Sequence, residues 1–160
     1  MAFSVTFNEA GFIHAVYEGE LDMPGIKGLM NTVGLAVKEH DCYLVLSDYS
    51  KATMAISIAD LYDMPKLVLQ RGKEMGVSVF KIKRALVIPA AAYEKFHFFE
   101  TVSLNNSQTV KIFTDEAEAG SGCWGNDPNP SSDSPLFVRR IAALTQRVAA
   151  LMPRAPHAGP

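Results

Sequence analysis

The stretch that most constrains the fold is "CYLVLSD", residues 42–48, a near-continuous apolar run that ends in polar residues. Apolar residues at successive positions are typical of a central β-strand that is covered on both faces. Apolar residues at helical spacing lie on either side of this run, at residues 22–37 and 57–76. Strands that alternate with helices need crossover connections, which make neighbouring strands parallel.

Further segments extend this alternation. Residues 3–7 and 12–19 are rich in aromatic and β-branched residues and are joined by the turn residues 8–11, which predicts an antiparallel hairpin. Residues 82–88 and 109–113 predict two more strands with an aromatic-rich helix between them. The predicted fold class is α/β: a five-stranded, mostly parallel sheet with one antiparallel strand from the hairpin, flanked by about four helices, plus an appended C-terminal helix.

Local signals set the helix ends. Asp22 is a predicted N-cap of the first helix, and Ser57 with Asp60 has the spacing of a capping box at the second. Gly76 is expected to end the second helix. Pro65 falls inside it, which predicts either a kink or two short consecutive helices.

Three glycines, Gly25, Gly28 and Gly34, fall within the first predicted helix. Each costs about 1 kcal/mol relative to alanine inside a helix, so three together indicate a backbone that packs closely on something. The sheet, a ligand and a second subunit are the alternatives.

Composition excludes several classes of protein. The net charge of -2 leaves no basic excess, so we do not expect a nucleic-acid partner. The two cysteines, Cys42 and Cys123, do not form a secreted disulfide framework and are expected as buried or half-buried thiols in a reducing cytosol. No signal peptide and no apolar run of the ~20 residues that a membrane span needs is present, so we expect a cytoplasmic protein without integral membrane association.

No catalytic pattern stands out. The four histidines and two cysteines lack metal-ligand spacing, and "HDC" at residues 40–42 falls at a helix-to-strand junction. Phosphate-binding glycine loops and a Gly-x-Ser-x-Gly elbow are missing. The charged residues Glu94, Lys95 and Glu100 are expected on a solvated helix face. We therefore expect no metal, no cofactor and no enzymatic activity.

The candidate site is the polar loop that follows the central strand. Its side chains either satisfy local backbone groups or form a site for a small anion, a phosphorylation or a partner. Ser50 and Ser57 are the predicted phosphorylation sites. The predicted ligand- or partner-binding residues are Asp48, Tyr49, Ser50, Lys51, Thr53 and Ser57.

The chain is predicted to divide into an α/β domain (1–124), a Gly/Ser/Pro-rich linker (125–134), an amphipathic helix (135–152) and a disordered tail (153–160). The helix carries an apolar stripe with coiled-coil spacing that is too short to be stable alone. It is expected to pack on its own domain, on a second copy in a homodimer, or on a membrane surface. The predicted oligomer-interface residues are Phe137, Ile141, Leu144, Val148 and Leu151.

The succession "GELDMPGIKGLMNTVG", "YLVLSDYS", "KRALVIPAAAYEKFHFFE" and "TVKIFTDEAEAGSGCW" resembles the SpoIIAA-like branch of the STAS superfamily, which is often grouped with the CRAL-TRIO lipid-exchange fold. The resemblance covers residues 3–124 and implies a non-enzymatic regulatory or binding module. In anti-sigma-factor antagonists of the superfamily, the matching loop carries an Asp-Ser-Ser-Gly-like motif whose serine is phosphorylated. Here the loop reads "SDYSKATMAIS" and departs from that motif.

Two functions follow as hypotheses. The first is a STAS-like module that docks a protein partner or small ligand near the loop after the third strand. The alternative is a carrier of an apolar ligand, a lipid or fatty acid, in a CRAL-TRIO-like pocket. Methionines, which adapt to varied apolar shapes, motivate the second hypothesis, although they also suit an ordinary core. They are Met23, Met30, Met54, Met64 and Met75.

Overall fold

The computed structural model describes residues 2–114 of the 160-residue chain. Its strands are β1 (Ala2–Asn8), β2 (Phe12–Leu21), β3 (Leu44–Asp48), β4 (Ala52–Met54), β5 (Lys83–Ile88) and β6 (Thr109–Thr114). Its α-helices are α1 (Met23–His40), α2 (Ile58–Met75) and α3 (Tyr93–Asn105), and the short 3-10 helices are η1 (Val79–Lys81) and η2 (Ala90–Ala92). The predicted linker, C-terminal helix and tail, together with a fourth helix at 115–124, lie outside the described residues.

The sheet has the strand order β1-β2-β3-β5-β6, and β4 pairs with β2. The β1-β2 hairpin is antiparallel, with Asn8 opposite Phe12, and every other pair of strands is parallel. The mostly parallel sheet with one antiparallel N-terminal strand is therefore confirmed.

The short strand β4 is the main difference from the prediction, which had five strands and a plain loop after β3. Strand β2 has ten residues and β3 has five, so β3 covers only residues 13–16 of β2. The backbone edge of the remaining part of β2 needs hydrogen-bond partners. Residues 52–54 return to it and pair with residues 19–21.

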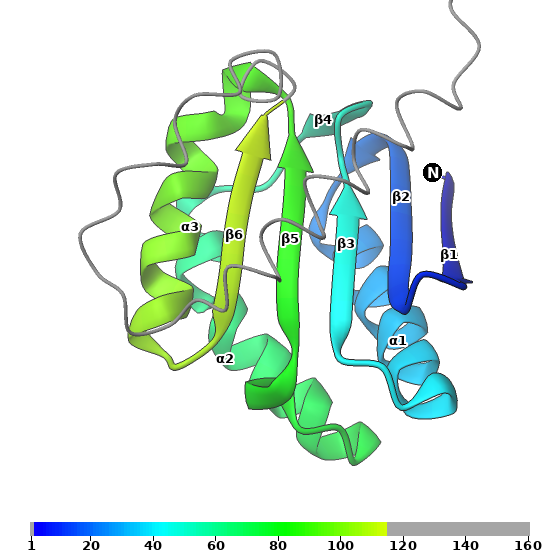
Figure 1. Ribbon diagram of the computed structural model, residues 1–160. Helices are drawn as coiled ribbons and strands as arrows, with labels where there is room; N and C mark the ends of the chain where they lie inside the picture. Colours follow the sequence, from blue (N-terminus) through cyan, green and yellow to red (C-terminus); the bar gives the residue numbers. More distant parts are fainter. Residues whose placement is uncertain (1, 115–160) are drawn as a thin grey trace, which may run out of the picture. The chain divides into compact units, whose positions relative to one another are not determined.

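The three described helices cover one face of the sheet (Figure 1). Tyr17 and Leu86 of the sheet share a buried cluster with Leu29 of α1, Leu61 of α2 and Phe96 of α3. Alternate residues of a strand point to opposite faces, so these sheet positions define the helix-facing side. The core of the described chain lies between this side and the helices.

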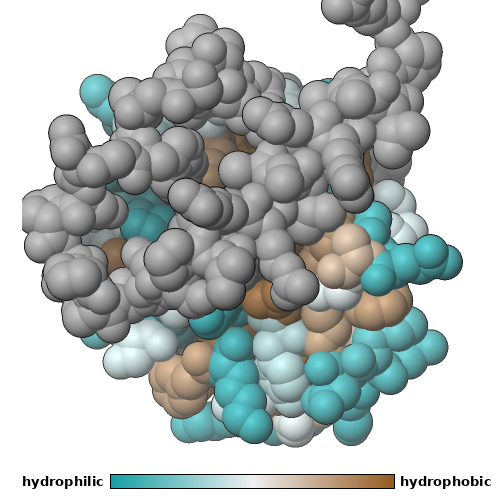
Figure 2. Space-filling model, viewed as in Figure 1, coloured by the Kyte–Doolittle hydropathy of each residue, from teal (hydrophilic) through white to brown (hydrophobic). Residues whose placement is uncertain are grey.

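Strand β3 is a central strand of the sheet, as predicted. Val45, Leu46 and Ser47 point alternately to the two faces, and all three are buried. In the lower part of Figure 2, where described residues are visible, hydrophobic and hydrophilic residues lie intermixed.

The predicted helix caps are confirmed. Asp22 Oδ1 accepts a hydrogen bond from the Gly25 backbone N–H at 2.8 Å. Ser57 and Asp60 form a complete capping box, and Gly76 ends α2 in the left-handed conformation. Helix α2 runs as one element through the buried Pro65, so the alternative of two short helices is wrong.

The glycines of α1 pack against other parts of the same chain. A Cβ atom on Gly25 would collide with the Tyr17 hydroxyl of β2, and one on Gly34 would lie 2.7 Å from the Met75 Sδ atom of α2. Sheet and neighbouring helix therefore account for the close packing of this helix. Among the described residues, no helix is long and apolar enough to cross a membrane.

Candidate functional site

A cavity of about 120 Å³ lies between the helices and the helix-facing side of the sheet. Its lining is predominantly apolar and includes Met30 and Val33 of α1, Met64 and Val68 of α2, and Phe99 of α3. An engineered apolar cavity of about 150 Å³ holds a benzene molecule, so a space of this order accommodates a small hydrocarbon.

The packing of α1 against α2 explains how the cavity arises. Gly34 lets the Met75 thioether lie directly against the α1 backbone, and both residues also line the cavity. Met30, Met64 and Met75 thus belong to the lining, whereas Met23 and Met54 pack partly buried against the core. Unbranched methionine side chains change rotamer easily, so this wall can adapt to an occupant.

One charged residue interrupts the apolar, helix-facing side of the sheet. The strand register places Ile13, Val45, Arg84 and Val110 in one row across β2, β3, β5 and β6. Residues in one row of a sheet point to the same face. Arg84 therefore points to the helix side, and its side chain lines the cavity.

The buried Gln108 holds Arg84 in place. Arg84 Nη2 donates a hydrogen bond to Gln108 Oε1 at 2.8 Å, and Gln108 Nε2 donates to the Pro65 carbonyl oxygen of α2 at 2.7 Å. A guanidinium only donates and a backbone carbonyl only accepts, so only this orientation of the amide satisfies both neighbours. The Arg84 guanidinium carbon also lies 6.0 Å from the centre of the Phe99 ring.

Within residues 2–114, no carboxylate forms an ion pair with Arg84. Burial lowers the pKa of Arg84 to about 10, and the nearby Tyr49 acts in the opposite direction. The guanidinium is still protonated at neutral pH. The Arg84 guanidinium has five N–H donors. Within the described residues, only one of them donates a hydrogen bond to a protein acceptor, Gln108 Oε1. Arg84 is half-buried, and a charge that is partly withdrawn from water without a counter-ion is costly, which makes Arg84 the most unusual feature of the lining.

Three further polar side chains border the cavity. Ser47 of β3 and Tyr49, directly after β3, add two hydroxyl groups. Burial raises the pKa of the Tyr49 phenol, while the Ser47 hydroxyl and the Arg84 charge oppose this shift. Arg71 of α2 also lines the cavity, but its Nη1 lies 2.9 Å from Glu74 Oε2, so its charge is already neutralised.

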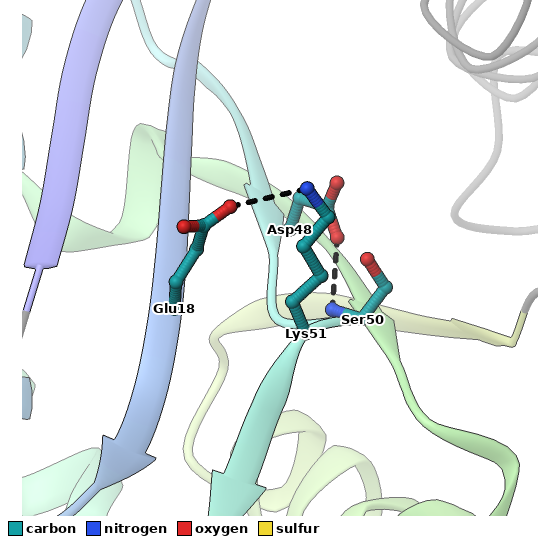
Figure 3. A network of polar contacts seen from close by, with 4 residues as sticks. All are labelled: Glu18, Asp48, Ser50 and Lys51. Carbon is teal, nitrogen blue, oxygen red and sulfur yellow. Dashed lines mark hydrogen bonds and ion pairs between the residues drawn. The ribbon is translucent and has the colours of Figure 1, made fainter. Parts of the chain in front are cut away.

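The predicted loop residues lie mainly outside the cavity. Asp48 Oδ1 accepts a hydrogen bond from the Ser50 backbone N–H at 2.9 Å, and Lys51 Nζ lies 3.1 Å from Glu18 Oε1 of β2 (Figure 3). These contacts correspond to the first alternative, in which loop side chains satisfy local groups and a neighbouring strand.

The other predicted site residues are separated along the chain. Thr53 is exposed on β4, and the Ser57 hydroxyl accepts the Asp60 backbone N–H at 3.0 Å in the capping box. Among the six predicted site residues, only Tyr49 lines the cavity, where Ile56 of the same loop joins it. The structure therefore separates an outer polar loop from an inner apolar site.

Other chemically reactive groups of the described residues lie apart from the cavity. Among the described residues, no group of three histidine, cysteine, aspartate or glutamate side chains could hold a metal ion. Cys42 is a half-buried free thiol, as predicted, and its Sγ lies 3.4 Å from the Gly11 carbonyl oxygen. His40 is exposed and stacks on Phe7, with ring centres 4.3 Å apart.

The prediction that Glu100 belongs to a solvated face is wrong. Glu100 is half-buried, and its Oε2 accepts the Ile112 backbone N–H at 3.2 Å. Its Oε1 lies 3.5 Å from Lys111 Nζ. Strand β6 ends the strand order of the described sheet, and Glu100 of α3 supplies an acceptor for the Ile112 N–H of this strand.

Fold and site together define a mixed α/β protein with an adaptable apolar cavity beneath its helices. A comparison with solved structures finds similarity to the anti-sigma factor antagonist SpoIIAA in its unphosphorylated form. The sequences are 15% identical, the TM-score is 0.47, and the match covers 75% of this chain and 95% of the other. This similarity concerns the fold alone. No protein-family model and no curated protein sequence matches the chain.

Sequence reasoning missed Arg84 and Gln108 as site residues. One signal was present: "IKRALVI" places an arginine in a strand whose neighbours are apolar. That signal gains meaning only from the register, which sets Arg84 on the helix side next to Gln108. The two residues are 24 positions apart in the sequence.

Proposed function

We propose that the chain is a non-enzymatic binding module that holds a small apolar molecule between its helices and its sheet. The cavity, with Met30, Met64 and Met75 in its wall, is the observation that supports this function. Tyr49 and Ile56 of the loop after β3 also line it. The proposed apolar site thus adjoins the predicted loop at Tyr49, while the other five predicted site residues lie outside it.

Titration with 1-hexanol, measured by isothermal titration calorimetry, tests this function. We expect saturable binding of one molecule per chain, and weaker binding after Val33→Leu, which extends a side chain into the cavity. Native mass spectrometry of gently purified protein provides an independent reading. Absence of saturable hexanol binding together with a clean unliganded mass would contradict the proposal.

Docking of a protein partner is a second candidate. Tyr62 of α2 and Phe98 of α3 stack with ring centres 6.5 Å apart although they are 55% and 38% exposed, and Ile58 lies exposed at the start of α2. Exposed aromatic side chains are enriched at protein interfaces. Ile58 and Tyr62 belong to α2, which begins directly after the predicted docking loop. The exposed apolar side chains favour a partner that presents apolar side chains to this surface.

A photo-crosslinking amino acid at position 62 tests the docking surface. The matched control is position 80, because Phe80 is an equally exposed aromatic residue (56%) in η1, which precedes β5 rather than following a strand. We expect a specific crosslink to a partner protein from position 62 and none from position 80. Equal crosslinking from both positions would count against a dedicated surface.

Phosphorylation of Ser50 or Ser57 also stays a proposal. It is tested by incubating the protein with cell lysate and ATP and mapping phosphate by mass spectrometry. The Ser57 hydroxyl already accepts the Asp60 N–H. Phosphate at Ser57 would add negative charge at a helix N-terminus, where it is favourable, but beside the Asp60 carboxylate, whose Oδ2 lies 2.5 Å from Ser57 Oγ and would repel it. A fully unmodified 50–57 segment would argue against the proposal.

A further inference from the structure

Arg84 brings a positive charge to the wall of an otherwise apolar cavity. Its row-mates Ile13, Val45 and Val110 are all buried and apolar, so neighbouring strands supply no counter-charge. A lone apolar ligand would leave this charge without a partner, at a cost in free energy.

Two contacts hold the Arg84 guanidinium in a defined position, as a ligand-binding group requires. Gln108 is buried and fixed by the Pro65 carbonyl, so the hydrogen bond from Arg84 to Gln108 has little freedom to shift. The Phe99 ring limits the guanidinium from another side. A planar guanidinium with unused donors matches the two oxygens of a carboxylate.

Arg71 provides an internal comparison. It lines the same cavity, but it is 38% exposed and paired with Glu74. The cavity therefore contains one arginine whose charge is neutralised within the chain and one, among the described contacts, whose charge is not. A single positive charge without a counter-ion corresponds to a ligand with a single negative charge.

We propose that the occupant of the cavity is a small amphipathic monocarboxylate whose carboxylate pairs with Arg84 while its hydrocarbon part lies among the methionines. Ser47 and Tyr49 also line the cavity, and each carries a hydroxyl group. This inference rests on the proposed function, because it names the class of ligand for the same cavity. Gln108 acts as a positioning residue in this site.

Hexanoate and 1-hexanol test the inference, since they share a six-carbon chain and differ in the charged group. At pH 7.5 we expect hexanoate to bind the wild-type chain about tenfold more tightly or better, as expected of a charge-assisted hydrogen bond. Arg84→Met should remove this preference and leave hexanol binding intact, which also shows that the variant is folded. Arg71→Met is the matched control and should keep the preference.

The possible results separate the two proposals. If neither probe binds the wild-type chain, the proposed function and this inference both fail. If both probes bind equally, the cavity is a ligand site but the inference is overturned. A preference that survives in Arg84→Met also overturns it. Arg84→Lys, which keeps the charge but loses the planar donor pair, should keep part of the preference, and a complete loss in a folded Arg84→Lys chain would contradict the role of the charge.

Discussion

Replacing Val33 by leucine tests whether the cavity is open space. Val33 of α1 lines the cavity, and the substitution adds one methylene group toward it. Burying a methylene stabilises by about 0.8 kcal/mol. An empty cavity costs about 24 cal/mol of stability per Å³, so the cavity of about 120 Å³ costs roughly 3 kcal/mol. The stabilisation from one added methylene is smaller than this cost, so filling part of the cavity can supply it. We expect the free energy of unfolding to rise by about 0.8 kcal/mol.

Val37→Leu is the matched control. Val37 lies one helical turn further along α1, is 1% exposed and packs in a cluster with Ile13 and Val45; Val45 lines the cavity, whereas Val37 itself does not. Because Val37 is buried and does not line the cavity, we expect the same extra methylene to overpack its surroundings, which costs about 1–3 kcal/mol. The change in helix propensity is the same for both variants and cancels in the comparison.

Urea denaturation of the two variants and the wild type measures the difference, which we expect to be about 2 kcal/mol or more between the variants. Hexanol binding should weaken in Val33→Leu and stay unchanged in Val37→Leu. If Val33→Leu destabilises the protein as much as Val37→Leu does, the space beside Val33 is filled, and the argument for a ligand cavity is refuted.

Three further predictions follow from single contacts. Gln108→Glu places a carboxylate beside Arg84 and should abolish the preference for hexanoate over hexanol in the same titration, and an unchanged preference would contradict the assigned pairing. Ser57→Ala removes the α2 cap and should lower stability to urea by about 1 kcal/mol, whereas Thr53→Ala, at an exposed position, should change it little. Burial lowers the pKa of His14 below its ordinary 6.5, so protons bind the unfolded chain first and stability should fall as the pH drops below about 6.5. Between pH 7.5 and 5.5, the free energy of unfolding should fall less in His14→Gln than in the wild type. Identical losses in both proteins would refute this.

Apart from β4 and the two short 3-10 helices, the sequence alone determined the order and type of the described elements, because the relevant signals are local. The hairpin residues 8–11, the caps at Asp22 and Ser57 and the stop at Gly76 each act through neighbouring backbone groups. The continuous apolar run of β3 reports burial on both faces wherever the strand lies. Such features need no knowledge of distant contacts.

The tertiary structure alone decided β4 and the cavity. Strand β4 forms because β2 extends beyond β3 and leaves an unpaired edge, a length mismatch between strands that are far apart in the sequence. The cavity depends on how α1 and α2 approach each other at Gly34 and Met75. Neither arrangement has a local signature, since both result from long-range packing.

Arg84 shows the boundary between the two kinds of information. The sequence shows an arginine in an apolar strand. It does not show which face of the sheet this residue occupies or whether a carboxylate lies next to it. The register puts Arg84 on the helix side, and the fold brings Gln108 and Phe99 to it without an acidic partner among the described residues. The local pattern supplied the charge, and three-dimensional packing left that charge facing a cavity.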